Sequence, residues 1–132
     1  MTLRLSLAAL LTATTAALAG ECPYPEFDAF LAAFDGDAAV QADHIRFPLE
    51  IAFLDMTAEP EPAKVTEQRA QSDLPLPLTL FPGPDVARRM VFDPAPDQRV
   101  VHVQGLDSGL SVSYYFAARP CWTLMRIDSD ST

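Results

Sequence analysis

The sequence predicts an α+β domain in which two short N-terminal helices pack on an antiparallel sheet of about four to six strands. Three observations support this fold class. Apolar residues recur at helical spacing after residue 26, they alternate at strand spacing after residue 46, and ten of the twelve prolines form five Pro-x-Pro pairs. Since proline breaks helix interiors and favours extended geometry before it, the composition excludes a long-helix bundle or a coiled coil.

The first 19 residues have the pattern of an export signal. Arg4 supplies a positive charge, residues 5–18 are uncharged and rich in Leu and Ala, and Ala17-Leu18-Ala19 fits the small-x-small pattern of a cleavage site. The apolar stretch is shorter than the roughly 20 residues of a membrane-spanning helix, so we expect no permanent anchor. We therefore expect a signal peptide over residues 1–19, a single domain over residues 20–132, and a periplasmic or secreted location.

The chain is strongly acidic. It has 9 Lys and Arg against 18 Asp and Glu, a formal net charge of −9, and loss of Arg4 with the signal gives 8 − 18 = −10. Nucleic-acid phosphates would repel such a chain, so we expect no nucleic-acid partner. The charge suits instead a partner or inhibitor role toward a cationic envelope or secreted protein.

The two cysteines, Cys22 and Cys121, allow only one intramolecular pairing. In an exported chain an even cysteine count favours a disulfide, and closing a loop of about 100 residues would contribute about 4 to 5 kcal/mol in the chain-entropy model. The alternatives are two free buried thiols, or a lipid-modified Cys22 of the bacterial lipoprotein kind. The charged Glu21 argues against lipidation, because such sites require a small residue immediately before the cysteine.

Two helices are expected at the start of the domain. An apolar stripe at i, i+3, i+4 and i+7 predicts the first helix, with Pro25 suited to its first turn and Gly36 to its C-terminal cap. The stripe consists of Phe27, Phe30, Leu31 and Phe34. Asp37 is placed to cap a second helix from Ala38 to about His44.

Strands are expected from residue 46 onward. Residues 46–54 alternate as one strand, whereas residues 57–73 are almost without apolar side chains and predict a long exposed loop with room for one helical turn. Residues 74–81 are apolar but interrupted by proline, so they can pair along one edge only or lie as extended coil. A short strand or turn around residues 88–92 and a turn at 93–97 lead to strands at 99–104, 110–118 and 121–127, which predict an antiparallel meander.

Two segments resemble the ends of a family of small exported bacterial proteins of unknown function. The first is Phe27-x-x-Phe30-x-x-x-Phe34-x-x-Asp37-x-x-x-Gln41 followed by Arg46-Phe47-Pro48-Leu49, and the second is Tyr115-Phe116-x-x-Arg119 followed by Trp122-x-Leu124-x-x-Ile127-Asp128-x-Asp130-Ser131. The resemblance implies a cystatin-like fold of the nuclear transport factor 2 superfamily, in which helices pack into the curve of a strongly bent antiparallel sheet. That superfold hosts enzymes, binding modules and structural partners alike, so it does not imply an activity.

Candidates for catalysis are few. Neither Gly-x-Ser-x-Gly nor Ser-x-x-Lys occurs, and only His44 and His102 could act as bases near neutral pH. We expect His102 to be a structural residue on a sheet face and His44 to interact with a helix end. The superfamily resemblance suggests a steroid-isomerase-like site with Asp55 and one of Tyr114 and Tyr115, since strand alternation sends the two tyrosines to opposite faces.

No cofactor or metal is expected. Asp35-Gly36-Asp37 and Asp128-Ser129-Asp130 have the alternating carboxylates of calcium loops. Neither segment has the remaining oxygen ligands or the terminal bidentate Glu of such a loop.

The remaining polar residues of the family-like motifs are Arg46, Arg119, Asp128 and Asp130. They are candidates to orient an anionic or peptide ligand at the edge of the sheet. The alternative is an ion-pair and turn network that ties the first strand to the closing hairpin.

We expect an exported, non-enzymatic binding module for a protein, a peptide or a small apolar ligand, with a homodimer left open. A small cone-fold enzyme of the isomerase or hydrolase type is the other alternative.

Overall fold

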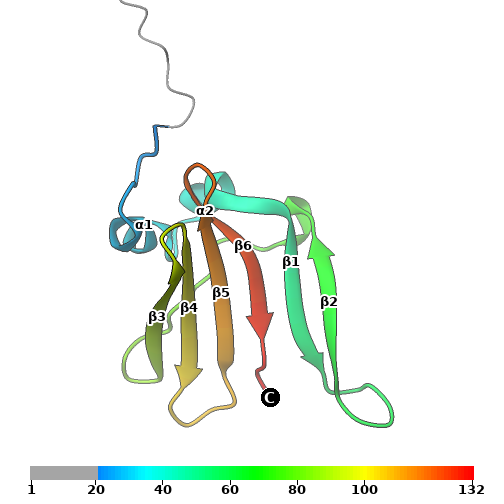
Figure 1. Ribbon diagram of the computed structural model, residues 1–132. Coiled ribbons are helices and arrows are strands. Elements are labelled where there is room, and N and C mark those ends of the chain that lie inside the picture. Colours follow the sequence, from blue (N-terminus) through cyan, green and yellow to red (C-terminus); the bar gives the residue numbers. More distant parts are fainter. Residues whose placement is uncertain (1–20) are drawn as a thin grey trace, which may run out of the picture.

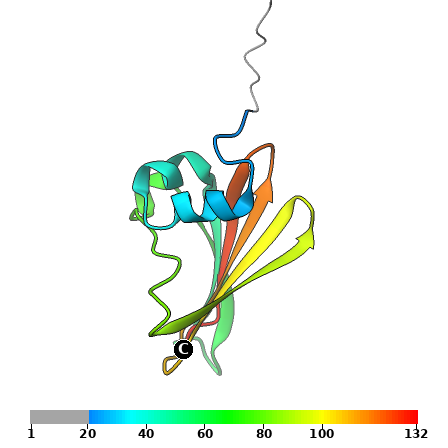
Figure 2. The same cartoon turned by 90° about the vertical axis from the view of Figure 1, so that its left-hand side faces the viewer.

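The computed structural model describes residues 21–132, so the expected signal peptide at residues 1–19 lies outside the described part. Within it, two helices precede six strands, and Figures 1 and 2 show the helices against one face of the sheet, near one of its ends. The helices are α1 (Phe27–Phe34) and α2 (Ala38–His44), and a 3-10 turn, η1 (Gln71–Asp73), follows the second strand. The strands are β1 (Ile45–Asp55), β2 (Ala63–Arg69), β3 (Ala87–Ala95), β4 (Gln98–Gly105), β5 (Ser111–Ala118) and β6 (Trp122–Ser129).

The two predicted helices are confirmed, but Pro25 lies before α1 and not in its first turn, because the helix begins at Phe27 after Glu26. The side chain of Asp37 accepts hydrogen bonds from the backbone N–H groups of Ala39 (3.0 Å) and Val40 (3.1 Å) at the start of α2. Gly36 between the helices has a φ of +76°, a backbone conformation that glycine adopts without steric cost. The apolar stripe of α1 is buried as the spacing predicts.

The sheet has the strand order β2-β1-β6-β5-β4-β3, so the last strand in the sequence lies near its middle. Strands β3 to β6 form the predicted antiparallel meander, but β1 and β6 are parallel, with Ile51 opposite Ile127. The described sheet is thus mostly antiparallel, as predicted, and β1–β6 is the exception. The segment between β2 and β3 takes the chain from one edge of the sheet to the other. The meander of β3 to β6 then returns toward β1, and its last strand, β6, runs in the same direction as β1.

The prediction of a loop over residues 57–73 is wrong in part. Ala63–Arg69 forms strand β2, paired with β1 from Leu49 opposite Arg69 to Asp55 opposite Ala63. This strand lies at an edge of the sheet and buries none of its side chains fully. Backbone hydrogen bonds hold it without an apolar face, so the sequence shows no strand-like alternation there. Strand β3 likewise continues to Ala95, through part of the turn expected at 93–97.

The segment between η1 and β3, residues 74–86, crosses the helix-covered side of the sheet without strand pairing (Figure 2). This agrees with the extended-coil alternative for its proline-interrupted part. Leu80 is only 1% exposed, and its backbone N–H donates to the carboxylate of Asp35 (2.9 Å). The crossing segment is therefore a packed part of the core.

Aromatic rings fill the space between α1 and the sheet. Phe30 and Phe34 of α1 are fully buried and contact Phe116 of β5 with ring centroids 5.6 and 5.5 Å apart. Phe27 packs on Trp122 of β6 at 5.0 Å. A solid aromatic core here counts against a small-molecule site under α1 and directs the search for a site to other surfaces.

Candidate functional site

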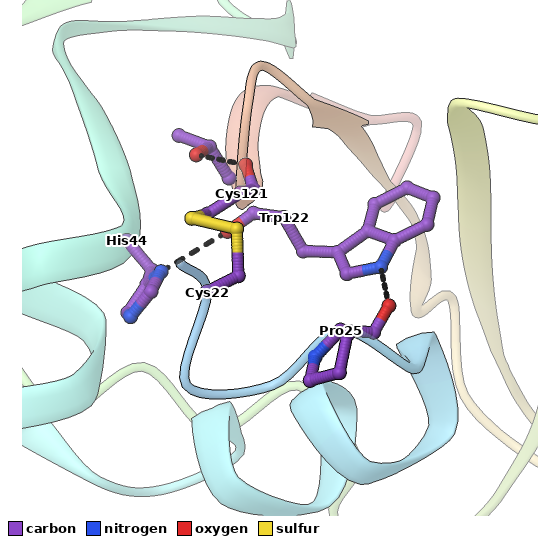
Figure 3. The surroundings of a disulfide bond; sticks show 6 residues. Cys22, Pro25, His44, Cys121 and Trp122 are labelled. Carbon is purple, nitrogen blue, oxygen red and sulfur yellow. Dashed lines mark hydrogen bonds between the residues drawn. A yellow bond between two sulfur atoms is a disulfide. The ribbon is translucent and has the colours of Figure 1, made fainter. Parts of the chain in front are cut away.

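The Cys22–Cys121 disulfide joins the segment before α1 to the turn between β5 and β6, as predicted (Figure 3). The neighbouring Trp122 strengthens this junction, because its indole N–H donates to the carbonyl of Pro25 (3.1 Å). The backbone carbonyl of Trp122 lies 3.1 Å from Nδ1 of His44 at the end of α2. One residue after the disulfide thus connects the N-terminal segment, α2 and β6. A cysteine in this bond has no thiol left to carry a lipid.

A hollow of about 370 Å³ lies between the β3–β4 turn and the β5–β6 turn. Val100 and Tyr115 are cross-strand partners in its wall, while the adjacent Val101 and Tyr114 are buried and face the helices. Because side chains alternate along a strand, Val100 and Tyr115 point away from the helices. The hollow therefore opens mainly on the uncovered face of the sheet. Its other lining residues are Pro94, Gln98, Arg99, Phe116, Ala117, Arg119 and Met125.

Two arginines line this hollow, and they differ in their contacts. The Arg99 Nε lies 3.0 Å from the carboxylate of Asp93, and its guanidinium is 5.1 Å from the ring centre of Trp122. Arg119, in contrast, is exposed, and within residues 21–132 no ion pair reaches its side chain. Its backbone N–H donates to the carbonyl of Cys121 (3.1 Å), which fixes the turn that carries it. Arg119 is thus positioned by the backbone with its charge available.

Asp128 lies in an ion-pair network whose basic partners, Lys64 and Arg126, the sequence analysis did not single out. Lys64 of β2 bonds to both Asp128 and Asp130, and Arg126 donates to the other Asp128 oxygen (3.0 Å). Burial raises the pKa of the Asp128 carboxyl, but the hydrogen bonds from Lys64 and Arg126 lower it by more, so this pKa lies below its ordinary value. The network connects β2 to β6 across β1.

This Lys64 network reaches the wall of the hollow through one aromatic contact. The guanidinium of Arg126 lies over the ring of Tyr115, 4.7 Å from its centre. Tyr115 lines the hollow, so Lys64, Asp128 and Arg126 together hold one side of its wall in place. Lys64 escapes detection in the sequence because 64 residues separate it from Asp128.

Arg46 is not brought together with the other candidates. It lies exposed at the start of β1 and does not line the hollow that contains Arg119. Of the four candidates, Asp128 and Asp130 lie together because both bond to Lys64. Arg119 lies apart from them, at the hollow between the β3–β4 and β5–β6 turns.

The residues considered for acid–base chemistry occupy separate positions. The Nδ1 of His102 bonds to the Ser113 hydroxyl on the neighbouring strand (2.8 Å). Tyr114 faces the core, where burial and then the charge of Asp35 raise its pKa, and Tyr115 faces away, as alternation predicts. Asp55 is the last residue of β1, where hydrogen bonds from the hydroxyl and backbone N–H of Thr57 lower its pKa. No hydrogen bond within residues 21–132 joins Asp55 to either tyrosine.

The carboxylates considered for calcium have other roles. Asp35 accepts from Leu80, Asp37 caps α2, and Asp128 and Asp130 share Lys64. In the described part of the chain, no group of three or more His, Cys, Asp or Glu side chains could hold a metal ion. The same residues include no helix long and apolar enough to cross a membrane.

Two helices on one face of a six-stranded, mostly antiparallel curved sheet define a nuclear transport factor 2-like α+β fold. The structure is similar to the crystal structure of such a protein from Bacteroides fragilis, with a TM-score of 0.58 and 17% sequence identity. The match covers 81% of this chain and 47% of the Bacteroides protein, so this chain spans about half the length of that structure. A scan of family models and a search of curated proteins find no match. The fold implied by the sequence resemblance is confirmed.

Proposed function

We propose that this chain is an exported, non-enzymatic binding module whose ligand enters the hollow between the β3–β4 and β5–β6 turns. One observation carries the proposal: a hollow of about 370 Å³ with largely apolar walls has, at its rim, an arginine without an ion pair in the described part of the chain. Apolar walls with a few placed polar groups are typical of ligand sites. The ligand that fits combines an apolar body with an anionic group, as in a small amphiphilic carboxylate or a peptide C-terminus.

The chemistry of Arg119 favours an acidic group on the ligand. A guanidinium presents a planar fork of N–H donors that matches a carboxylate with two parallel hydrogen bonds. Arg126 stacks on Tyr115 behind the wall but is paired with Asp128, so its charge is already balanced. Because the whole chain is acidic, the positive charge of Arg119 attracts an anion only at short range.

The disulfide supports the exported part of the proposal. Structural disulfides form and persist in oxidising compartments, and this one joins positions 99 residues apart. Together with the expected signal at residues 1–19, it supports a periplasmic or secreted protein.

The test uses the oxidised chain 20–132 and two matched probes, dodecanoate and uncharged dodecanol, titrated below their aggregation limits and followed by backbone NMR shifts. We expect dodecanoate to shift the amides of Val100, Tyr115 and Arg119, and Arg119→Ala to weaken its binding about tenfold or more, the loss of one charge-assisted contact. Arg46→Ala is the control, since it removes an exposed arginine elsewhere and should leave binding unchanged.

A second variant tests the apolar walls. Met125→Trp places a larger side chain at the hollow and should weaken both probes, whereas Arg119→Ala should affect only the charged one. Equal binding by the Arg119→Ala and Arg46→Ala variants, or shifts confined to another surface, would show that the proposed site is wrong.

A further inference from the structure

Exposed apolar side chains gather at the open edge of β3. Within residues 21–132, five large hydrophobic side chains are exposed. Val91 and Phe92 belong to β3 and are 42% and 51% exposed, and Val86 immediately precedes the strand. Leu106 lies beside Val86, to whose carbonyl its N–H donates (3.0 Å), whereas Met56 alone lies elsewhere. Such a concentration on an edge strand marks an interaction surface.

The backbone of β3 leaves one row of hydrogen-bonding groups unused by the sheet. The Leu106-to-Val86 bond and the antiparallel register, with Arg88 opposite Gln104, set the alternation along the strand. Val86 and the even-numbered residues of β3 up to Phe92 direct their N–H and C=O groups to β4. The backbone groups of Arg89 and Val91 consequently face the open edge, whereas the Ala87 N–H donates to the Gly83 carbonyl (3.1 Å) and Asp93 lies in the register shift between Phe92 and Ala95.

This edge is complementary to a second copy of itself. In an antiparallel pair centred on Val91, Val91 lies opposite the same residue of the other copy, Arg89 lies opposite Asp93, and Met90 lies opposite Phe92. Opposite charges thus meet on one face of the joined sheet and apolar side chains on the other. A pair centred on Met90 would also bring outward-facing backbone groups together. It would place Arg89 opposite Val91 of the other copy, however, so no opposite charges would meet.

The carboxylate of Asp93 can accept a hydrogen bond from Arg89 of a second copy. Its side chain is 70% exposed, and Oδ1 lies 3.0 Å from Nε of Arg99. A carboxylate accepts hydrogen bonds at both oxygens, so Oδ2 can receive the second arginine. The guanidinium of Arg89 lies over the ring of Phe81, 5.1 Å from its centre.

The opposite edge of the sheet is unlike β3. Strand β2 carries Lys64, Glu67 and Arg69, and charged side chains on an edge strand oppose pairing with another chain. The register shift between Phe92 and Ala95 ends the regular row on β3. We propose that two copies of this chain form a homodimer by antiparallel pairing of their β3 strands about Val91, which joins the two sheets into one.

Sedimentation of the ligand-free chain 20–132 tests the dimer independently of any ligand. We expect a concentration-dependent dimer that Arg89→Asp alone and Asp93→Arg alone each weaken about tenfold or more, because each sets like charges opposite one another twice. An equal mixture of the two variants should associate again, since Asp at 89 then meets Arg at 93 and the native pair remains at the other end.

A cysteine cross-link locates the axis. In a hydrogen-bonded antiparallel pair the facing Cα atoms are about 5.5 Å apart, within disulfide range, so Val91→Cys should form a covalent dimer on mild oxidation. Met56→Cys is the control, an apolar residue 55% exposed outside β3, and should form no covalent dimer under the same conditions. A wild-type chain that is monomeric at every soluble concentration, or a dimer indifferent to the charge variants, would overturn the proposal.

Discussion

The side-chain amide of Gln41 pairs with the backbone of Leu78 as a neighbouring strand would. Its Nε2 donates to the Leu78 carbonyl (2.7 Å), and its Oε1 accepts from the Leu78 N–H (2.6 Å). The same Nε2 donates to the carbonyl of Phe34 (2.9 Å), and Gln41 is fully buried. One side chain of α2 therefore holds both the end of α1 and the crossing segment, which has no strand partner.

Replacing Gln41 by leucine should destabilise the protein clearly. Gln41→Leu keeps the side-chain volume but leaves the Leu78 N–H unpaired, at a cost of about 1 to 3 kcal/mol. The carbonyls of Leu78 and Phe34 each lose one bond but keep those from the N–H groups of Gly36 and Asp37. Urea unfolding followed by circular dichroism measures the change. Gln104→Leu is the matched control on an exposed site, expected within about 0.5 kcal/mol of wild type. Equal small effects at both positions would contradict the anchoring role.

Leu80 tests whether the crossing segment belongs to the core. Leu80→Ala should cost about 2 to 4 kcal/mol, because the removed methyl groups leave a cavity beside the helices and sheet. Leu106→Ala, at a site 49% exposed, should change the unfolding free energy little. Thermal unfolding of both variants gives the comparison. If the crossing segment were only loosely attached to the core, the Leu80→Ala and Leu106→Ala variants would unfold at similar temperatures.

Reduction of the disulfide should lower stability more than any single substitution above. The bond spans 99 residues, and the chain-entropy model assigns about 4 to 5 kcal/mol to a loop of this length. The double variant Cys22→Ala with Cys121→Ala, unfolded in urea beside the oxidised chain, measures the loss. Intact mass should rise by about 2 Da on reduction of the wild type, the two hydrogens of a cleaved bond. An unchanged mass would contradict the bond in solution.

Asp128 should contribute to acid sensitivity. Its pKa is lowered below the ordinary 3.8 in the folded protein, so its ion pairs stabilise the fold above that pH and lose their effect as the carboxyl is protonated. The free-energy difference between wild type and Asp128→Asn should therefore be largest near neutral pH and shrink below pH 3.8. Asp107→Asn, in the exposed β4–β5 turn, is the control and should show no such convergence. A difference independent of pH would exclude the ion pairs as its cause.

The elements with regular apolar spacing could be predicted from the sequence. The phenylalanine stripe of α1 and the alternation in β1 each bury one face, so each leaves a periodic pattern. Strand β2 leaves none, because an edge strand is held by its backbone and its side chains stay polar. The parallel pairing of β1 with β6 was equally hidden, since strand order depends on how the crossing segment runs over the core.

The candidate site was predictable only in its separate parts. The disulfide was predicted from the even cysteine count together with the expected export signal. The sequence also singled out Arg119 and Asp128, without showing that they lie in different surroundings. Lys64 and Gln41 make contacts 64 and 37 residues away along the chain, and a pattern of local spacing cannot register such distances. The hollow itself arises where two turns meet, so no single segment encodes it.

The central position of β6 constrains the moment at which this protein can fold. Strand β1 meets β5 only through β6, and β6 is the last strand to be synthesised. A nascent chain that ends before residue 122 can form neither the parallel pair nor the bond of Cys22 to Cys121 with its β6 support. The sheet thus closes only once nearly the whole chain has been synthesised, and the helices, β1 and β2 cannot complete their packing before β6 is available.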